Sequence, residues 1–142
     1  NEMQAAYGLL QLKYVDDLIS KRKEITQKYR ELLMDVPGLR FLPDMDGVEH
    51  GYSYFPVLIN QEKYGISRDA LYEELKKKNI FTRRYFYPLV SSFNPYCHLP
   101  SARAANLPIA TEHAGNVLCL PLYADLEFSD VQFICSIIKD RE

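Results

Sequence analysis

The first 36 residues carry one helical pattern, and this pattern constrains the fold more than any other feature. Apolar and small side chains recur at steps of three, four or seven until Pro37-Gly38: Ala5, Gly8, Leu12, Val15, Leu18, Ile25, Tyr29, Leu32 and Val36. Asn1 is placed to cap this helix, with Gln4 three residues later as in a capping box. The sequence therefore predicts one long helix over residues 1–36.

The two parts of this predicted helix differ in surface chemistry. Residues 21–33 are polar outside the apolar stripe, whereas residues 3–12 are apolar nearly all round. A helix that is apolar on all sides needs neighbours on all sides, and one face already serves the domain's own core. We expect the second face to contact another domain or another subunit. The alternative is that a short terminal turn packs into this domain's own core.

The residues after Pro37-Gly38 predict a small layered structure. Residues 52–60, "YSYFPVLIN", are aromatic and β-branched, as in a strand whose Pro56 lies at an edge or a bulge. The further elements that we expect are a capped helix over 67–79, a strand over 80–88, a loop over 88–107, a short helix over 109–115 and a strand over 116–123.

A final helix follows near residue 129. Ser129 and Gln132 form a capping box, and Phe128 and Phe133 are placed for a hydrophobic staple. The apolar stripe of this helix consists of Val131, Ile134, Cys135 and Ile138. The predicted fold class is α+β: a long N-terminal helix and a small, mostly antiparallel sheet with helices packed on it.

Composition limits the classes of function. A chain of 142 residues with 47% hydrophobic content fits one domain with its own core. Its net charge of -2 gives no overall attraction to nucleic acid or to an anionic membrane, and no apolar run has the length of a membrane span. Cys97, Cys119 and Cys135 are odd in number and widely spaced, which argues against a disulfide framework or a zinc site and favours a reducing cytoplasm.

Catalytic motifs are scarce. His50, His98 and His113 lie in expected loops or at helix ends, and we expect each of them to be a solvated surface residue. The sequence contains no nucleophile elbow, P-loop, dinucleotide fingerprint or zinc-protease motif.

The exception is "FTRRYFYPL", residues 81–89, where Arg83 and Arg84 precede Tyr85 and Phe86. The planar fork of an arginine matches carboxylate or phosphate oxygens, and an adjacent aromatic ring can stack on a sugar or a base. In a strand the two arginines point to opposite faces, so at most one of them shares a pocket with a ligand.

Two other interpretations of this segment compete. In the first, one arginine pairs with a surface glutamate and the other lies along aromatic rings. In the second, "KKKNIFTRRYFY" binds nucleic acid, but the segment lacks the glycines of an RNA-binding strand motif and the net charge opposes it.

Several segments, in order, resemble the DegT/DnrJ/EryC1/StrS family of sugar aminotransferases. They are "NEMQAAYGLLQLKYVDDLISKRKEITQKYRELL", "YSYFPVLI", "GISRDALYEELKKKNIFTRRYFYPL", "NPY", "LPIATEHAGNVLCLPLY" and "VQFICSIIKD". The resemblance covers essentially the whole chain. The version "TRRYFYPL" is most similar to members that act on the 4-keto group of nucleotide-linked 4-keto-6-deoxy sugars.

This resemblance implies that residues 1–142 are the C-terminal small domain of a fold-type I, pyridoxal-phosphate-dependent homodimer. Residues 1–36 would be the interdomain helix and residues 37–142 the α+β layer. The cofactor-binding domain, with the lysine that forms the Schiff base, is absent from this chain. We therefore expect no catalytic residue, no metal ligand and no bound cofactor in this chain alone.

The resemblance also implies a reaction and a role for the arginines. The full enzyme would transfer an amino group from glutamate to a nucleotide-linked keto-sugar in the cytoplasm, for cell-surface polysaccharides or antibiotic sugars. Arg83 or Arg84 would bind the glutamate carboxylate or the phosphate of the sugar nucleotide, while Tyr85 and Phe86 would shape the sugar end of the cleft.

Two alternatives remain open at this point. Instead of an aminotransferase domain, the chain could be a stand-alone α+β module that binds a small anion, or a dimerisation and protein-interaction domain without a ligand.

Overall fold

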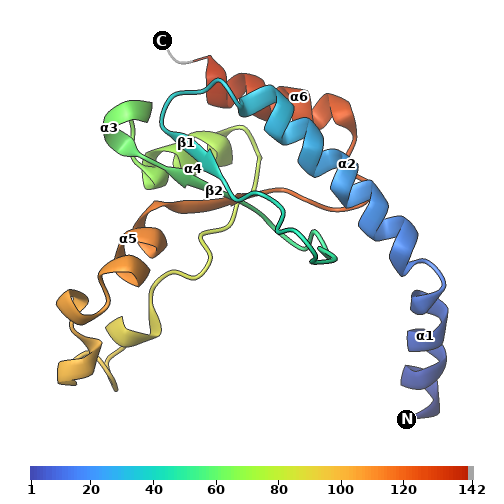
Figure 1. The fold of residues 1–142 in the computed structure, drawn as a ribbon, viewed down its shortest axis with the longest axis horizontal. Helices are drawn as coiled ribbons and strands as arrows, with labels where there is room; N and C mark the ends of the chain where they lie inside the picture. The colour runs from blue at the N-terminus through green and yellow to red at the C-terminus, as the bar shows by residue number, and fades with distance from the viewer. Residues whose placement is uncertain (141–142) are drawn as a thin grey trace. The chain divides into compact units, whose positions relative to one another are not determined.

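The structure is a computed structural model that describes residues 1–140, so the expected domain of residues 1–142 extends two residues beyond the described range (Figure 1). The chain forms two compact units. Unit 1 comprises residues 1–34, 44–55 and 122–140, and unit 2 comprises residues 35–43 and 56–121.

Unit 1 begins with two helices in place of the single long helix that the sequence predicts. They are α1 (Glu2–Leu12) and α2 (Val15–Leu33), and the chain bends between them (Figure 1). At the break, the backbone N–H groups of Lys13 and Tyr14 donate to carbonyl oxygens three residues back, at 3.3 and 3.0 Å, so the α-helical ladder is interrupted by a tighter turn. The predicted capping box at Asn1 and Gln4 is confirmed.

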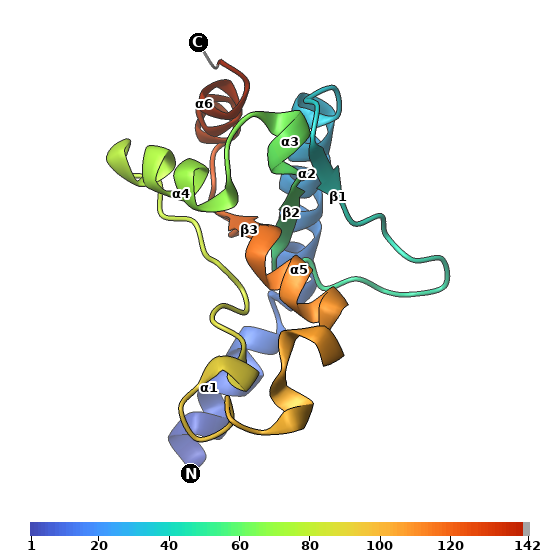
Figure 2. The ribbon, with the colours of Figure 1, turned by 90° about the vertical axis from the view of Figure 1, so that its left-hand side faces the viewer.

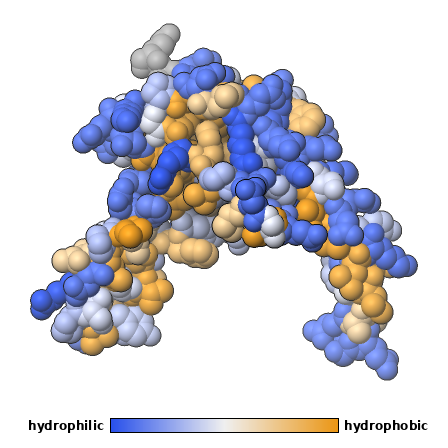
Figure 3. Space-filling view, in the orientation of Figure 1, coloured by the Kyte–Doolittle hydropathy of each residue, from blue (hydrophilic) through white to orange (hydrophobic). Residues whose placement is uncertain are grey.

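Helix α1 contributes no buried residue to unit 1. Its apolar side chains are exposed, with exposed fractions that range from 81% at Met3 to 53% at Leu10, and Figure 3 shows hydrophobic side chains along this helix. The alternative that this terminal segment packs into the chain's own core is therefore wrong for the described residues. The apolar face of α1 is available for contact with something else.

The core of unit 1 lies between α2 and α6 (Phe128–Lys139), which pack against each other (Figure 1). The predicted stripe of α6 is confirmed, because its members are all buried: Val131, Ile134, Cys135 and Ile138. From α2, Tyr29 is fully buried and stacks on Phe55 with ring centroids 4.9 Å apart.

The predicted cap of α6 is wrong. The N-cap is Glu127, whose side chain makes no capping hydrogen bond, so Ser129 lies inside the first turn. Phe128 and Phe133, expected to form a staple around a Ser129 cap, are each about half exposed. The helix is therefore stabilised by burial of its apolar stripe, and its first residue is not determined by the predicted cap motif.

Residues 44–55 of unit 1 form an irregular loop that α2 holds in place. Arg22 donates to the carbonyl oxygens of Gly51 and Tyr52, at 2.9 Å each. Asp44 accepts from Arg30 at 2.8 Å and from the Tyr52 hydroxyl at 2.7 Å. Tyr52 has a φ of 46°, outside the extended region, so the strand predicted to begin at residue 52 begins only at Phe55.

Unit 2 is built on a three-stranded sheet of β1 (Leu39–Phe41), β2 (Phe55–Ile59) and β3 (Val117–Leu120), with β2 in the centre. Strands β1 and β2 are antiparallel, with Arg40 opposite Leu58. Along β2 burial alternates, so Val57 and Ile59 face the core while Leu58 faces outward. The expected small antiparallel sheet is confirmed, and Pro56 lies before the residues of β2 that pair with β1.

A short helix that the sequence analysis missed, α3 (Gln61–Tyr64), follows β2, and Asn60 caps it. The chain at Gly38 passes so close to α3 that a Cβ atom there would lie 2.5 Å from the backbone nitrogen of Tyr64. Gly38 also has a φ of +80°, so this close approach requires glycine.

The remaining elements of unit 2 surround the sheet. Helix α4 (Arg68–Lys77) begins at the predicted cap Ser67, and Asn79, the predicted stop, has a φ of 61°. Helix α5 (Pro108–Asn116) and strand β3 confirm the predicted helix and strand. The loop between residues 88 and 107 contains three single 3₁₀ turns, η1 (Val90–Ser92), η2 (Pro100–Ala102) and η3 (Ala104–Asn106).

Among residues 1–140, no helix is long and apolar enough to span a bilayer.

Candidate functional site

The segment that carries the two arginines is not the strand predicted over residues 80–88. Its only pairing in the described structure is an isolated antiparallel bridge, in which Arg83 and Cys119 exchange backbone hydrogen bonds of 3.0 and 2.8 Å. The chain then turns at Tyr85 and Phe86, and the Tyr85–Phe86 and Tyr87–Pro88 peptide bonds are cis. Figure 2 shows this stretch leaving α4, passing β3 and entering the loop region. The orientation of the two arginine side chains therefore does not follow from strand alternation and has to be read from their contacts.

Arg84 is held by groups of unit 2. Its Nη1 donates to Oδ1 of Asp69 at 2.9 Å, and its guanidinium lies 4.5 Å from the ring centroid of Tyr72 and 5.4 Å from that of Tyr87. The hydrogen bond to Asp69 raises the pKa of Arg84 above its usual range. Arg84 is thus already paired with a carboxylate and with aromatic rings.

Asp69 also connects this segment to a buried arginine. Arg68 is only 2% exposed, forms an ion pair with Asp69 at 2.8 Å, and donates from Nη1 to the carbonyl oxygens of Ala114 and Val117 at 3.0 Å each. Burial alone would raise the pKa of Asp69, but the hydrogen bond from Arg84 and the charge of Arg68 hold it below its usual range. Arg68 and Asp69 therefore fasten the arginine segment to the end of α5.

Arg83 differs from its neighbour. Its side chain is exposed, its Nη1 donates to the Tyr85 hydroxyl at 2.9 Å, and its guanidinium lies 5.8 Å from the centroid of that ring. Within residues 1–140 no carboxylate forms an ion pair with Arg83. Together the two arginines fit the competing interpretation from the sequence, in which one pairs with a carboxylate, here Asp69, and the other lies beside an aromatic ring, here Tyr85. Arg83 is also exposed and has no carboxylate partner among residues 1–140, so its guanidinium is accessible to an anion.

The two aromatic residues after the arginines frame Arg83. Tyr85 is half-buried, Phe86 is 76% exposed, and their ring centroids lie 5.4 Å apart with planes tilted by 45°. An exposed ring next to a guanidinium that has no carboxylate partner among residues 1–140 offers an apolar surface beside a group able to bind an anion. The structure brings Arg83, Tyr85 and Phe86 together and turns Arg84 towards α4.

A cavity of about 580 Å³ follows this segment in unit 2. It is lined in part by Tyr87, Leu89, Cys97, Arg103 and Thr111. The sequence analysis missed Arg103, which lies in a loop without a motif, and it missed the roles of Arg68 and Asp69. Asp69 and Arg84 are 15 residues apart on different segments, so no local pattern marks their contact.

Among residues 1–140, the remaining ionisable groups show no arrangement typical of a catalytic centre. His50 and His98 are exposed as expected, but His113 is half-buried, and its Nδ1 is shielded without a hydrogen-bond partner, which corrects the expectation of a solvated residue. Among residues 1–140 no group of histidines, cysteines and acidic residues is placed to hold a metal ion.

The lysines of this chain do not fit the role of a cofactor anchor. An anchoring lysine needs a shielded site that favours its neutral, nucleophilic form. Every lysine here is exposed except Lys28, which is half-buried and pairs with Glu31 at 2.9 Å.

Comparison with known proteins gives consistent matches along the chain. The chain is 50% identical over 141 residues to the dTDP-4-amino-4,6-dideoxy-D-glucose transaminase of Escherichia coli, covering 99% of this chain and 38% of that protein. It is 36% identical to the transaminase of the same name from Shigella dysenteriae, covering 99% of this chain and 37% of the relative.

Solved structures agree in fold. A crystal structure of DesI in the presence of its TDP-sugar product matches with a TM-score of 0.87 and 30% identity, over 95% of this chain and 34% of that one. The present chain thus spans little more than a third of the length of these relatives.

Residues 1–139 match the family's sequence pattern, in agreement with the resemblance seen in the sequence. The chain belongs to the DegT/DnrJ/EryC1/StrS aminotransferase family.

Proposed function

We propose that the protein is a pyridoxal-phosphate-dependent aminotransferase that transfers the amino group of glutamate to the 4-keto group of a dTDP-linked 4-keto-6-deoxy sugar. The observation that carries this proposal is the 50% identity, along 99% of the chain, to a dTDP-4-amino-4,6-dideoxy-D-glucose transaminase. A relative this similar over the whole of the present chain supports the same class of substrate.

In this proposal the chain supplies part of the substrate-binding wall. Arg83 binds an anionic group, either the glutamate carboxylate or a phosphate of the sugar nucleotide, because its fork is exposed and has no carboxylate partner among the described residues. Tyr85 and Phe86 provide the apolar surface at the sugar end. Arg84 positions the segment through Asp69 and does not bind substrate.

The cofactor is bound by parts of the protein outside these 142 residues, because the lysines of this chain are exposed or paired. When bound, pyridoxal phosphate supplies the electron sink for amino-group transfer. The residues of this chain bind and orient the substrate, and the chain alone does not transaminate.

The exposed apolar face of α1 supports a larger assembly. We assign this face to contact with the part of the protein that this chain does not include, in a cytoplasmic homodimer. A stand-alone anion-binding module is less well supported, because it would leave this face of α1 in water.

The test is amination by the protein expressed from its complete gene. With pyridoxal phosphate, L-glutamate and dTDP-4-keto-6-deoxy-D-glucose, mass spectrometry is expected to detect dTDP-4-amino-4,6-dideoxyglucose and an equal amount of 2-oxoglutarate. A preparation that is loaded with cofactor but forms no amino sugar would refute the proposal. Turnover of only a GDP-linked 4-keto sugar would refute the nucleotide assignment.

A further inference from the structure

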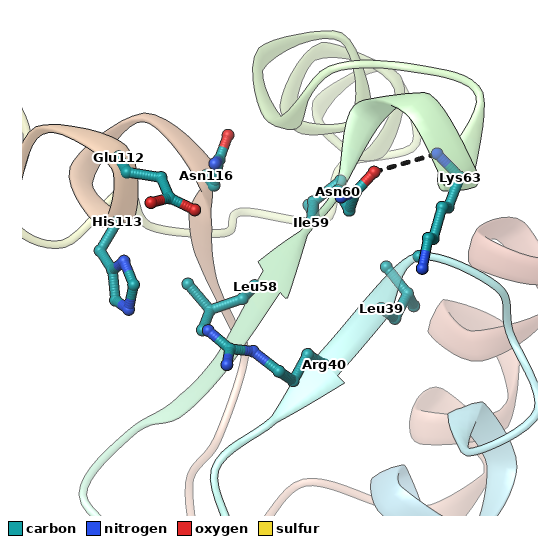
Figure 4. A pocket seen from close by; sticks show the side chains of 10 residues that line it. Leu39, Arg40, Leu58, Ile59, Asn60, Lys63, Glu112, His113 and Asn116 are labelled. Carbon is teal, nitrogen blue, oxygen red and sulfur yellow. Dashed lines mark hydrogen bonds between the residues drawn. The ribbon is translucent and has the colours of Figure 1, made fainter. Parts of the chain in front are cut away.

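A second site in unit 2 lies on the outer face of the sheet. A cavity of about 460 Å³ is open between α5 on one side and β1 and α3 on the other (Figure 4). It arises from strand alternation: Val57 and Ile59 point into the core, which leaves Leu58 and its cross-strand neighbour Arg40 on the outer face. None of the residues that line it belongs to the arginine segment of residues 83–89.

The walls of this cavity carry charges of opposite sign. Arg40 on β1 and Lys63 on α3 supply two cations, and Glu112 on α5 supplies one carboxylate across the cavity from them (Figure 4). In the part of the chain that the structure describes, none of these three side chains forms an ion pair. The charges are therefore available to a ligand, and they sum to a net charge of about +1.

Further polar groups and an apolar side chain complete the cavity. His113 and Asn116 follow Glu112 on α5, and Nδ1 of His113 is shielded without a hydrogen-bond partner among the described residues. Buried polar atoms are normally hydrogen-bonded, so this nitrogen is an exception in the wall of the cavity. Leu58 lies between the side chains of Arg40 and Glu112 (Figure 4).

We propose that this cavity binds an α-amino dicarboxylate, that is, an acidic amino acid. Such a ligand carries two carboxylates and one ammonium at neutral pH, which matches the two cations and one carboxylate of the walls in number and in sign. Arg40 and Lys63 bind the carboxylates, Glu112 binds the ammonium, and Leu58 contacts the methylene carbon. A volume of this order is typical of small-molecule sites.

The proposal is independent of the transaminase assignment, and the test uses L-aspartate as the probe. L-Aspartate is titrated into the ¹⁵N-labelled 142-residue chain, and amide shifts are followed by NMR. Saturable shifts are expected at Arg40, Lys63, His113 and Asn116.

Arg40→Gln and Glu112→Gln are each expected to weaken binding about tenfold, because each removes a charge-assisted hydrogen bond. Both side chains are exposed, so these variants retain the fold.

The controls separate this site from others. Lys77→Gln removes an exposed charge on α4 outside the cavity and is expected to leave the affinity unchanged. Succinate, which lacks the ammonium, is expected to bind about tenfold more weakly than L-aspartate. Equal binding of succinate, or the absence of saturable binding, would overturn the proposal. Shifts confined to residues 83–87 would also overturn it, since they would assign L-aspartate to the substrate wall. Failure of the amination assay, in contrast, leaves this result unaffected.

Discussion

At the scale of single residues, two aspartates fix segments that have no regular secondary structure. Asp44 accepts hydrogen bonds from Arg30 and Tyr52 and so attaches the loop of residues 44–55 to α2. Asp69 pairs with Arg68 and Arg84 and so attaches the arginine segment to α4. An irregular segment lacks the ladder of backbone hydrogen bonds found in helices and strands, and here the side-chain bonds of a carboxylate hold the segment in place.

The contribution of Asp44 to stability depends on pH. Hydrogen bonds from Arg30 and then Tyr52 lower the pKa of Asp44 from 3.8 to about 2. Because the pKa is lower in the folded state, this stabilisation is complete above about pH 4 and is lost as the pH falls towards 2. The side chain is 37% exposed, so solvent screening limits the effect to about 1 kcal/mol.

We therefore expect Asp44→Asn to lower the free energy of unfolding at pH 6, and the difference from the wild type to shrink towards pH 2. Urea denaturation at several pH values measures this difference. Asp46→Asn, at an exposed position of the same loop, serves as the control and is expected to have little effect at any pH. A difference for Asp44→Asn that stays constant from pH 6 to pH 2 would contradict the assigned pKa.

Single residues also show how much of the candidate site can be predicted from the sequence. The residue types of "RRYF" are sufficient to predict a guanidinium beside aromatic rings, which the structure shows at Arg83 and Tyr85, whereas anion binding there stays a prediction. They are not sufficient to distinguish Arg83 from Arg84. That difference depends on Asp69, whose proximity results from tertiary structure.

At the scale of elements, the helices and strands that can be predicted from the sequence are those with a strong apolar period or a clear cap. Helices α4 and α6, strand β3 and most of α2 are in this class. The break between α1 and α2 has no signal, since the apolar period continues through Lys13 and Tyr14 and neither residue is a helix breaker. Residues 80–88 have strand composition, but the chain turns after one bridge with β3. Strand propensity therefore yields a strand only where pairing partners exist.

Helix α1 provides a test at this scale. Leu9→Gln together with Leu12→Gln is expected to change the free energy of unfolding of the 142-residue chain by no more than about 0.5 kcal/mol, because both side chains are exposed. In the protein from the complete gene the same substitutions are expected to lower the melting temperature, since the proposed partner surface covers this face.

A substitution in the core provides a reference value for the loss of stability in this experiment. Leu33→Ala, at a fully buried position of α2, is expected to cost about 3 kcal/mol in the 142-residue chain. If the double substitution in α1 destabilised this chain as strongly as Leu33→Ala, the apolar face of α1 would belong to the chain's own core. The proposed contact with another part of the protein would then be wrong.

At the scale of the whole molecule, the sequence was sufficient to assign the family but not to complete the site. The order of motifs along the chain is a global property, and the matches along 99% of the chain bear it out. In our proposal the substrate site also includes residues outside this chain, so the residues described here form only one part of it. What the structure adds is the set of contacts that supports the proposed division of roles, in which Arg83 binds an anion and Arg84 positions the segment.

The most direct test of this division is steady-state kinetics of the protein from the complete gene with Arg83→Gln, Arg84→Gln or Lys78→Gln. For Arg83→Gln we expect KM for either glutamate or the sugar nucleotide to rise about tenfold or more, with an unchanged melting temperature. Arg84→Gln is expected mainly to lower the melting temperature, and Lys78→Gln, at an exposed position, to change neither quantity. If KM for both substrates were unchanged in Arg83→Gln, this chain would not supply the anion-binding wall through that residue.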